Sequence, residues 1–203
     1  MKVKEVLAIK EWIDGNQQWQ NRFAITKISE IELERISQLT TPNQVLAIIE
    51  QRDPGQTILT KGKITLALDT IQDPGNMGAM VRIADWFGLE QLVCSHDSAD
   101  VYNPKVIQSS MGSIARVNVF YVDLKIWLSQ QKETRIYAAT LEGQDITGMK
   151  KPGEAIIIIG NESKGISAEL LALANVKITI PRKGKAESLN AAVAAGLVLG
   201  FLS

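Results

Sequence analysis

Residues 155–159 read Ala-Ile-Ile-Ile-Ile, a run without a single polar side chain, and a glycine follows directly at Gly160. A short run of this kind predicts a strand that is buried on both of its faces. Such strands are typical of parallel sheets that helices cover on both sides. This run therefore constrains the chain to an α/β architecture more strongly than any other segment.

The rest of the chain from Ile64 onward fits that architecture, because segments that predict strands alternate with segments that predict helices. Strands are expected at 64–68, 91–94, 117–121, 135–139, 155–159 and 176–180. Helices are expected at 77–87, 103–111, 124–132, 168–173 and from Ala191 onward. The terminal helix is nearly free of polar side chains, so we expect it to be buried. This alternation predicts a parallel sheet, whose ligands bind beyond the carboxyl ends of its strands.

Residues 1–55 lack the regular alternation of strands and helices that begins at Ile64, and they predict a small appended module. Strands are expected at 6–9, 22–25 and 45–49, and a helix at 29–36 that Ser29 caps together with Glu32. Residues 51–56 (Gln-Arg-Asp-Pro-Gly-Gln) predict a linker. The module is short for a robust domain by itself. The predicted organisation is thus a module at 1–55 and a main domain at 56–203.

Composition narrows the classes of protein that the chain can represent. Lys and Arg together number 22, as do Asp and Glu, so the formal net charge is zero and bulk electrostatic binding of nucleic acid is disfavoured, although a local basic patch is compatible. The single cysteine excludes an internal disulfide framework and a thiolate metal cluster, and Cys94 is expected in the core. No apolar stretch is long enough to span a membrane. We expect a soluble, cytoplasmic protein.

Three loops leave predicted strands and approach predicted helices. In the first, Asp73-Pro-Gly forms a turn signal, Asn76 is expected to cap the following helix, and Arg82 falls within its second turn. This loop lacks both the dinucleotide-binding glycine pattern and the P-loop pattern. An ordinary cap at Asn76 and a solvated Arg82 fit the loop equally well.

The second loop, Ile159-Gly-Asn-Glu-Ser-Lys-Gly165, follows the apolar strand directly. Gly160 allows a ligand or another backbone segment to come close, and Glu162 in such a position needs a polar partner. The third loop, Ile180-Pro-Arg-Lys-Gly-Lys-Ala-Glu-Ser-Leu-Asn190, combines cations with polar residues that suit a helix start. Each loop also fits a plain polar turn, and lone residues such as His96 and the scattered tryptophans fit packing roles.

Taken together, the three loops resemble the sequence motifs of the SpoU (TrmH-type) RNA 2′-O-ribose methyltransferases of the SPOUT superfamily. The motifs stand here as Asp73-Pro-Gly-Asn-Met-Gly-Ala-Met-Val-Arg82, Ile159 to Gly165 and Ile180 to Asn190. Tyr102-Asn-Pro-Lys-Val and Ser110-Met-Gly-Ser are also similar to the family. The resemblance covers residues 60–203.

The resemblance implies a parallel α/β sheet with a C-terminal trefoil knot, a homodimer whose active site is completed across the interface, and S-adenosyl-L-methionine as the cofactor. Carried over by motif, the residues implied to bind the cofactor are Gly160, Ile180, Leu189, Thr140 and Leu141. The residues implied to act in catalysis are Arg82, Asn76, Glu162, Ser188 and Asn190. No metal is implied.

The implied activity is methyl transfer from the cofactor to a ribose 2′-OH of structured RNA, ribosomal or transfer RNA. Because a guanidinium stays protonated, Arg82 is expected to stabilise the developing alkoxide and hold a phosphate rather than accept the proton. The residues expected to contact RNA are Arg82, Lys164, Arg182, Lys183 and Lys185. The alternative is a SPOUT-fold RNA-binding protein without catalytic activity.

Two features depart from the family pattern. Arg182 stands after the proline of the third motif, where an apolar residue is common. The module at 1–55 resembles only the second half of the ribosomal L30-type substrate-binding domain that many members carry. This second departure leaves the selection of the RNA open.

Overall fold

The computed structural model describes residues 1–203, which form two compact units, Met1–Asp53 and Pro54–Ser203. The first unit is a three-stranded sheet in the order β2-β1-β3. Its elements in chain order are β1 (Val3–Ala8), α1 (Lys10–Gly15), the 3₁₀ turn η1 (Gln17–Trp19), β2 (Ile25–Lys27), α2 (Glu30–Ile36) and β3 (Val45–Ile49). The central strand β1 runs parallel to β2 and antiparallel to β3.

Two sequence predictions in this unit are confirmed. The strand at 45–49 is present, and Ser29 caps α2 in a capping box in which the Glu32 side chain accepts from the Ser29 backbone. The predicted strand at 22–25 is wrong for most of its length, since β2 starts only at Ile25. The N–H groups of Arg22 and Phe23 both donate to the Trp19 carbonyl, so these residues form a turn. The short helical elements α1 and η1 were not predicted.

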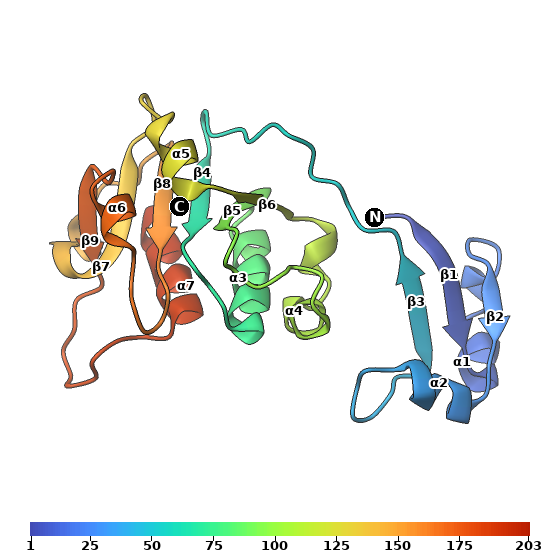
Figure 1. Ribbon diagram of the computed structural model, residues 1–203. Helices are drawn as coiled ribbons and strands as arrows, with labels where there is room; N and C mark the ends of the chain where they lie inside the picture. Colours follow the sequence, from blue (N-terminus) through green and yellow to red (C-terminus); the bar gives the residue numbers. More distant parts are fainter. The chain divides into compact units, whose positions relative to one another are not determined.

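The second unit is built on a six-stranded sheet in the order β6-β5-β4-β8-β7-β9, and every pairing in it is parallel (Figure 1). The strands are β4 (Ile64–Leu68), β5 (Gln91–Ser95), β6 (Asn118–Val122), β7 (Ile136–Asp145), β8 (Ala155–Ile159) and β9 (Val176–Thr179). The helices are α3 (Pro74–Trp86), α4 (Pro104–Ser110), α5 (Leu124–Ser129), α6 (Ala168–Leu171) and α7 (Ala191–Leu202), with short 3₁₀ turns η2 (Ser113–Ala115) and η3 (Ile146–Gly148). The predicted parallel α/β sheet is confirmed.

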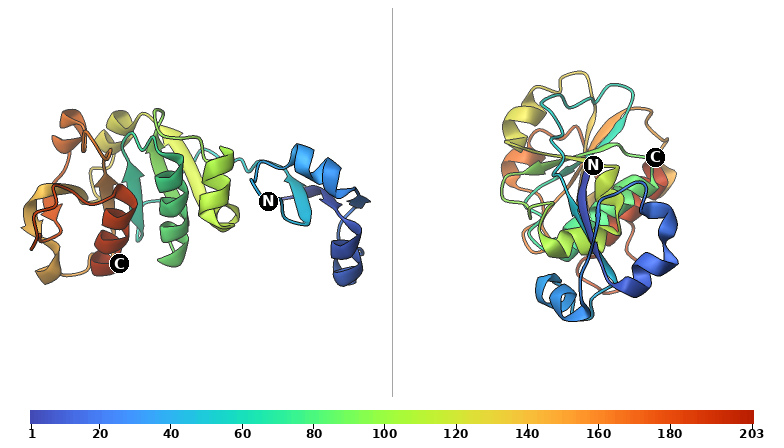
Figure 2. Two further views of the ribbon diagram at one scale, coloured as in Figure 1. Left: turned by 90° about the horizontal axis from the view of Figure 1, so that it is seen from below. Right: turned by 90° about the vertical axis from the view of Figure 1, so that its right-hand side faces the viewer.

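Helices cover both faces of this sheet, as the apolar strand at 155–159 predicts. On one face, α3, α4 and α7 pack against alternate strand residues such as Leu66 and Ile157. On the other face, α5 and α6 pack against the intervening residues, such as Ala67 and Ile156. Figures 1 and 2 show α3 and α7 side by side on their face. All five residues of β8 are buried, which explains its lack of polar side chains.

Two further expectations need correction. The strand predicted at 135–139 continues to Asp145, and its pairing with β9 shifts between Ala139 and Gln144, so residues 140–143 bow out of the ladder. The terminal helix α7 is not buried all round: its alanine-rich face is buried, whereas Val193, Leu197 and Phe201 are exposed. Among the helices of both units, none combines the length and the apolar character that a membrane span requires.

Gly78 permits the close packing of α3 on α4. A Cβ at this position would lie 1.8 Å from the Ser109 Oγ and 2.6 Å from the Val106 carbonyl oxygen. The Ser109 hydroxyl also donates to the Pro74 carbonyl over 3.2 Å, which ties the start of α3 to α4. Gly78 is therefore required by the packing of α3 on α4, and its replacement would push the two helices apart.

We expect Gly78→Ala to lower the free energy of unfolding by about 1–3 kcal/mol, the usual effect of overpacking a tight contact. Urea denaturation followed by circular dichroism measures this change. Gly196→Ala in α7 is the matched control, because its nearest neighbour would be the Ile83 Cδ1 at an ordinary 3.7 Å. The control is expected to be neutral or stabilising by up to about 1 kcal/mol. A Gly78→Ala protein as stable as the control would contradict this account of the helix contact.

Candidate functional site

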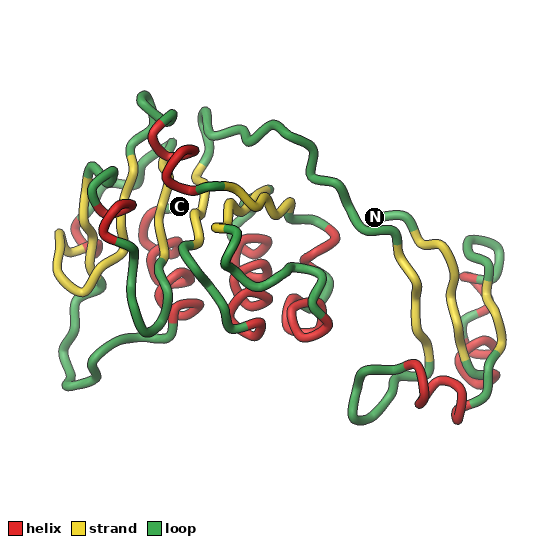
Figure 3. Tube along the Cα trace, in the orientation of Figure 1, coloured by secondary structure: helices red, strands yellow, loops and turns green.

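The three motif loops gather at the carboxyl edge of the sheet (Figure 1). The first follows β4 and leads into α3, the second follows β8 and leads into α6, and the third, the long connection from β9 to α7, stands out as a loop in Figure 3. Strands β4 and β8 pair over all five residues, so Leu68 and Ile159 end side by side. The first two loops therefore start next to each other, where parallel sheets usually bind ligands.

The helix cap in the first loop is Asp73 and not Asn76, which corrects the sequence prediction. The Asp73 carboxylate accepts from the Asn76 N–H over 2.7 Å, and Pro74 occupies the first turn of α3. Asp followed by Pro is a strong helix start, because the aspartate accepts a free N–H and the proline has none to satisfy. The cap thus leaves the Asn76 side chain free for other partners.

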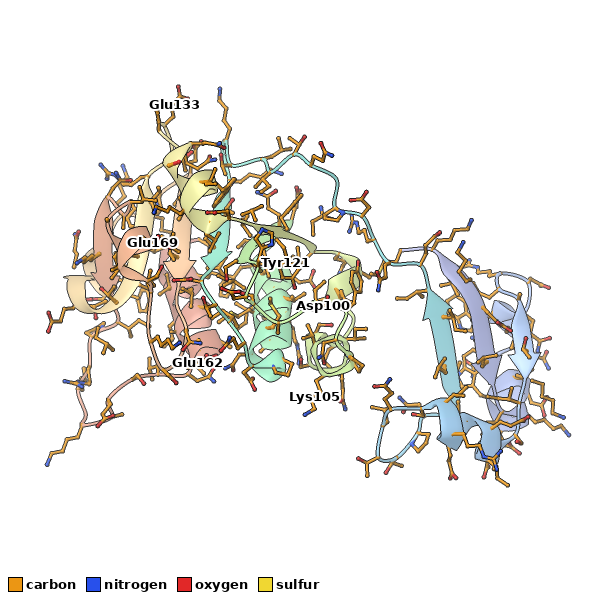
Figure 4. The ribbon with its side chains drawn as sticks, viewed as in Figure 1. Asp100, Lys105, Tyr121, Glu133, Glu162 and Glu169 are labelled. Atoms are coloured by element: carbon orange, nitrogen blue, oxygen red, sulfur yellow. The ribbon has the colours of Figure 1, made fainter.

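The side chains of Asn190, Asn76 and Glu162 form a hydrogen-bonded chain that joins all three loops. The Asn190 Nδ2 donates to the Asn76 Oδ1 over 2.8 Å, and the Asn76 Nδ2 donates to the Glu162 Oε1. Figure 4 labels Glu162 on the loop after β8, near the starts of α3 and α7. Asn190 also caps α7, because its Oδ1 accepts from the Ala192 and Val193 N–H groups over 3.0 and 3.2 Å. Three residues predicted to act together are therefore in direct contact.

The second loop folds back on itself at Gly160. A Cβ at this position would lie 2.3 Å from the Gly165 carbonyl carbon, so the close neighbour is the backbone of the same loop. Asn161 and Gly165 form an antiparallel bridge, with N–H to oxygen distances of 3.0 and 2.8 Å, and Gly165 takes the positive φ of +69° that favours glycine. The two glycines hold Glu162 at the tip of a tight turn.

Sequence reasoning overlooked Asn161, Asp69 and Thr70, which hold the first two loops together. The Asn161 Nδ2 donates to the Thr70 carbonyl over 2.8 Å, and its Oδ1 accepts from the Ser163 and Lys164 N–H groups. The buried Asp69 carboxylate accepts from the Ser167 N–H over 2.8 Å. A carboxylate directly after a buried strand was the available signal, because a charge in that position needs partners.

Thr70 is one of two residues other than glycine with a positive φ, and its value is 57°. This conformation is uncommon for a β-branched residue, so the surrounding bonds must hold it. The Thr70 N–H donates to the Ser95 Oγ over 2.8 Å, and its hydroxyl donates to the Asp69 Oδ1 over 3.1 Å. With the bond from Asn161, which follows β8, the turn after β4 is held at the ends of both neighbouring strands, β5 and β8.

The five residues predicted to bind the cofactor lie on the bowed segment of β7, the second loop and the third loop. The Thr140 hydroxyl donates to the Glu142 carbonyl over 2.6 Å, and the Thr179 hydroxyl donates to the Leu141 carbonyl over 3.1 Å, so Thr140 and Leu141 lie beside the end of β9. Leu141 and Leu189 are exposed apolar side chains. The backbone groups of Gly160, Ile180 and Leu189 have no hydrogen-bond partner within the protein.

The side chains of the remaining predicted residues form no hydrogen bond or ion pair with the Asn190–Asn76–Glu162 chain. Arg82 is exposed on α3 and forms no ion pair, and the Ser188 side chain makes no hydrogen bond. Lys164, Lys183 and Lys185 are exposed in the second and third loops. The Arg182 guanidinium donates to the Ala186 carbonyl over 3.1 Å within the third loop.

Cys94 does not contribute a nucleophile. It is completely buried in β5, and burial raises the pKa of its thiol far above the ordinary value, because the charged thiolate is disfavoured there. The sequence prediction of a core cysteine is confirmed.

A model of the SpoU rRNA methylase family matches residues 63–200 of the chain. The 23S rRNA (guanosine(2553)-2'-O)-methyltransferase RlmP of Bacillus subtilis is 32% identical over 178 residues, which cover 86% of this chain and 71% of that protein. A 23S rRNA (uridine(2479)-2'-O)-methyltransferase of Streptomyces viridochromogenes is 32% identical over 171 residues, which cover 78% of this chain and 59% of that protein.

Solved structures show the same fold. A TrmH-family protein from Porphyromonas gingivalis superposes with a TM-score of 0.85 at 31% identity, over 98% of this chain and 81% of that one. An AdoMet-bound rRNA methyltransferase from Sinorhizobium meliloti superposes with a TM-score of 0.84 at 25% identity, over 98% of this chain and 78% of that one. With its three motif loops joined at the carboxyl edge of a parallel sheet, and with these matches, the chain belongs to the SpoU rRNA methylase family.

Proposed function

We propose that the protein transfers a methyl group from S-adenosylmethionine to a ribose 2′-OH of RNA. The observation that carries this proposal is the hydrogen-bonded chain of Asn190, Asn76 and Glu162, which fixes polar groups from all three motif loops at one point. A protein that only binds RNA needs no such convergence of side chains. We therefore favour the enzyme over a non-catalytic RNA-binding protein of the same fold.

The residues around the bowed segment of β7 fit the cofactor. Unpaired backbone groups at Gly160, Ile180 and Leu189 can recognise the adenine and the amino-acid part of the cofactor, and the exposed leucines at 141 and 189 can cover apolar surface. Thr140, tied to the neighbouring backbone, fixes the bowed segment. S-adenosylmethionine supplies an electrophilic methyl group when bound.

The protein has to orient the ribose 2′-OH and stabilise the charge that develops on its oxygen. Arg82 is the cation we assign to this role, since a permanently protonated guanidinium stabilises an alkoxide and holds the adjacent phosphate. Glu162 orients Asn76 rather than Arg82, as the hydrogen bond between them supports. Asn190 then positions the third loop, and the unpaired Ser188 hydroxyl contacts the ribose.

Arg82 does not contact the other site residues within one chain, and we propose that a homodimer brings it to the partner's site. Val193, Leu197 and Phe201 form an exposed apolar stripe on α7, and Trp86, one turn after Arg82 on α3, is 84% exposed. A Cβ added at Gly196 or Gly200 of α7 would lie 3.7 or 3.8 Å from the side chain of Ile83 or Phe87 of α3, and the two helices pack against each other. Exposed apolar residues in this number are typical of an interface, and covering them would place Arg82 at its edge.

We also propose the trefoil knot of the family. Strand β9 is the outer strand of the sheet beyond β7, yet the chain returns from it to pack α7 against α3 and β8. A return of this kind is compatible with threading through the loop after β8.

Ribosomal RNA is the substrate class that the relatives favour, because the Bacillus and Streptomyces proteins are both named 23S rRNA methyltransferases. The chain spans 59% of the Streptomyces relative and 60% of another from Borreliella burgdorferi. Lys164, Arg182, Lys183 and Lys185 supply phosphate contacts, and the unit of residues 1–53 takes part in substrate binding. Methylation of ribosomal RNA as the proposed activity implies a cytoplasmic location.

Calorimetric titration with S-adenosylmethionine tests the cofactor site. We expect the wild type to bind and Leu189→Trp to weaken binding by at least about tenfold, because the larger side chain fills the site. Leu59→Trp is the matched control, since Leu59 is also exposed but precedes β4 at the opposite edge of the sheet, and this variant should bind like the wild type. A folded wild type that does not bind would refute the cofactor assignment.

Arg82→Ala tests the catalytic role of Arg82. We expect methyl transfer to ribosomal RNA to fall by at least about 100-fold, as is usual when a group that stabilises a transition-state oxyanion is lost. Binding of S-adenosylmethionine should change less than about threefold. Arg135→Ala, an exposed arginine just before β7, is the control and should retain activity. Unchanged turnover of Arg82→Ala would remove this residue from the mechanism.

Leu197→Glu tests the dimer. A buried unpaired carboxylate in the interface is costly, so we expect this variant to elute as a monomer where the wild type is a dimer, with light scattering giving the mass. Ile126→Glu places the same charge on an equally apolar exposed position of α5, on the other face of the sheet, and should remain dimeric. If Leu197→Glu and Ile126→Glu were both dimeric, or if the wild type were a monomer, α7 would be excluded as the interface.

A further inference from the structure

Residues 16–24 connect α1 to β2 (Figure 3). Their side chains are not used by the proposed methyl transfer. Residues 16–23 read Asn-Gln-Gln-Trp-Gln-Asn-Arg-Phe, which is five side-chain amides around two aromatic rings and one cation. All acidic residues of the first unit lie in residues 1–14 and 30–53, so none falls within 15–29. A segment with this composition favours a polyanionic partner that presents flat rings.

The two rings and the cation are already stacked. The Trp19 and Phe23 rings lie 5.8 Å apart with planes 27° from parallel, and the Arg22 guanidinium carbon lies 5.5 Å from the Trp19 ring centre. The Trp19 carbonyl accepts from the N–H groups of both Arg22 and Phe23, over 2.9 and 3.1 Å, which fixes their spacing. A nucleobase can extend this stack without first ordering it, and the guanidinium can attract the adjacent phosphate.

The amides around the stack divide into two groups. Asn16 and Gln20 donate to the carbonyls of Trp12 and Ile13, so these two hold the turn against α1. Gln17, Gln18 and Asn21 are exposed, and their side chains have no partner within the protein. Amides both donate and accept, so they can read the edges of bases. Packing of the small unit explains the first group but gives no reason for the second.

We propose that the segment Asn16–Phe23 is a binding surface for unpaired nucleotides of the RNA substrate, through stacking on the Arg22–Trp19–Phe23 group and base-edge contacts from Gln17, Gln18 and Asn21. Unpaired nucleotides fit better than duplex RNA, because the bases of an A-form helix offer neither a free ring face nor accessible major-groove edges. The inference rests on the proposed function in taking RNA as the partner. It adds which part of the first unit binds it and in which form.

Binding of full-length protein to fluorescein-labelled RNA, measured by anisotropy, tests this surface. The probes are a single-stranded oligouridylate, a single-stranded oligoadenylate and an RNA duplex of equal length. We expect Trp19→Ala to weaken binding of the single strands by about tenfold, the usual effect of losing one stacked base, and binding of the duplex by less than about twofold. Trp19→Phe keeps a ring and should restore most of the affinity.

The double variant Gln18→Ala with Asn21→Ala removes side chains that support nothing in the fold, so it tests the surface even where Trp19→Ala fails to fold. We expect it to weaken single-strand binding several-fold. Gln38→Ala with Asn43→Ala is the matched control, since it removes one exposed glutamine and one exposed asparagine elsewhere in the same unit, and it should bind like the wild type. Wild-type affinity in the Gln18/Asn21 variant, or an equal loss in the control, would overturn the proposal.

Calorimetry with S-adenosylmethionine on the same variants separates this inference from the proposed function. Cofactor binding should be unchanged in all of them, since their substitutions lie in the first unit. A wild type that binds no cofactor but loses single-strand binding on Trp19→Ala would sustain the RNA surface and refute the methyl transfer. A wild type that binds the cofactor, together with variants that all bind RNA as tightly as the wild type, would support the cofactor assignment and refute the RNA surface.

Discussion

The parallel pairing of β4 with β8 is the contact on which the candidate site depends. It runs over five residues, from Ile64 with Ala155 to Leu68 with Ile159, and it pairs residues that are 91 positions apart in sequence. Since both strands end at the same edge, the loops that follow them start side by side. The Asp69 N–H extends the ladder by donating to the Ile159 carbonyl over 2.9 Å, so the backbone register continues into the loops.

Side-chain hydrogen bonds then convert this adjacency into a fixed geometry. Asn161 and Asp69 each bond backbone groups of the other loop, and the Asn190–Asn76–Glu162 chain adds the third loop. The two of these bonds that a carboxylate accepts, at Asp69 and Glu162, are charge-assisted and partly shielded, and such bonds are stronger than neutral exposed ones. A preorganised site is what transition-state stabilisation requires, so the same bonds that stabilise the edge of the sheet support the proposed chemistry.

Helix α7 contributes one side to the fold and leaves its other side to the proposed dimer. The buried side of α7 combines alanines with Val198, Leu199 and Leu202 and packs on the sheet and on α3, while its exposed side carries Val193, Leu197 and Phe201. The sequence of a helix that is apolar on all sides predicts that the helix is buried. Whether the other side of such a helix is buried within the chain or left exposed depends on where the neighbouring helices end. The sequence pattern of the helix does not contain that information.

Local patterns were enough to predict several features: the apolar strand 155–159, the capping box at Ser29, the buried Cys94, and the motif residues whose spacing carried the resemblance to the family. The cap of α3 was assigned to Asn76 rather than Asp73, because Asp73-Pro-Gly was interpreted as a turn, although Asp followed by Pro is also a local signal for a helix start. The tertiary structure was needed to show that Asn76 bonds Glu162 and Asn190, while Arg82 forms no bond with these three residues. It was also needed to show that Gly160 leaves space for the backbone of Gly165. Contacts between residues distant in sequence follow from strand order and register, which local propensity does not fix.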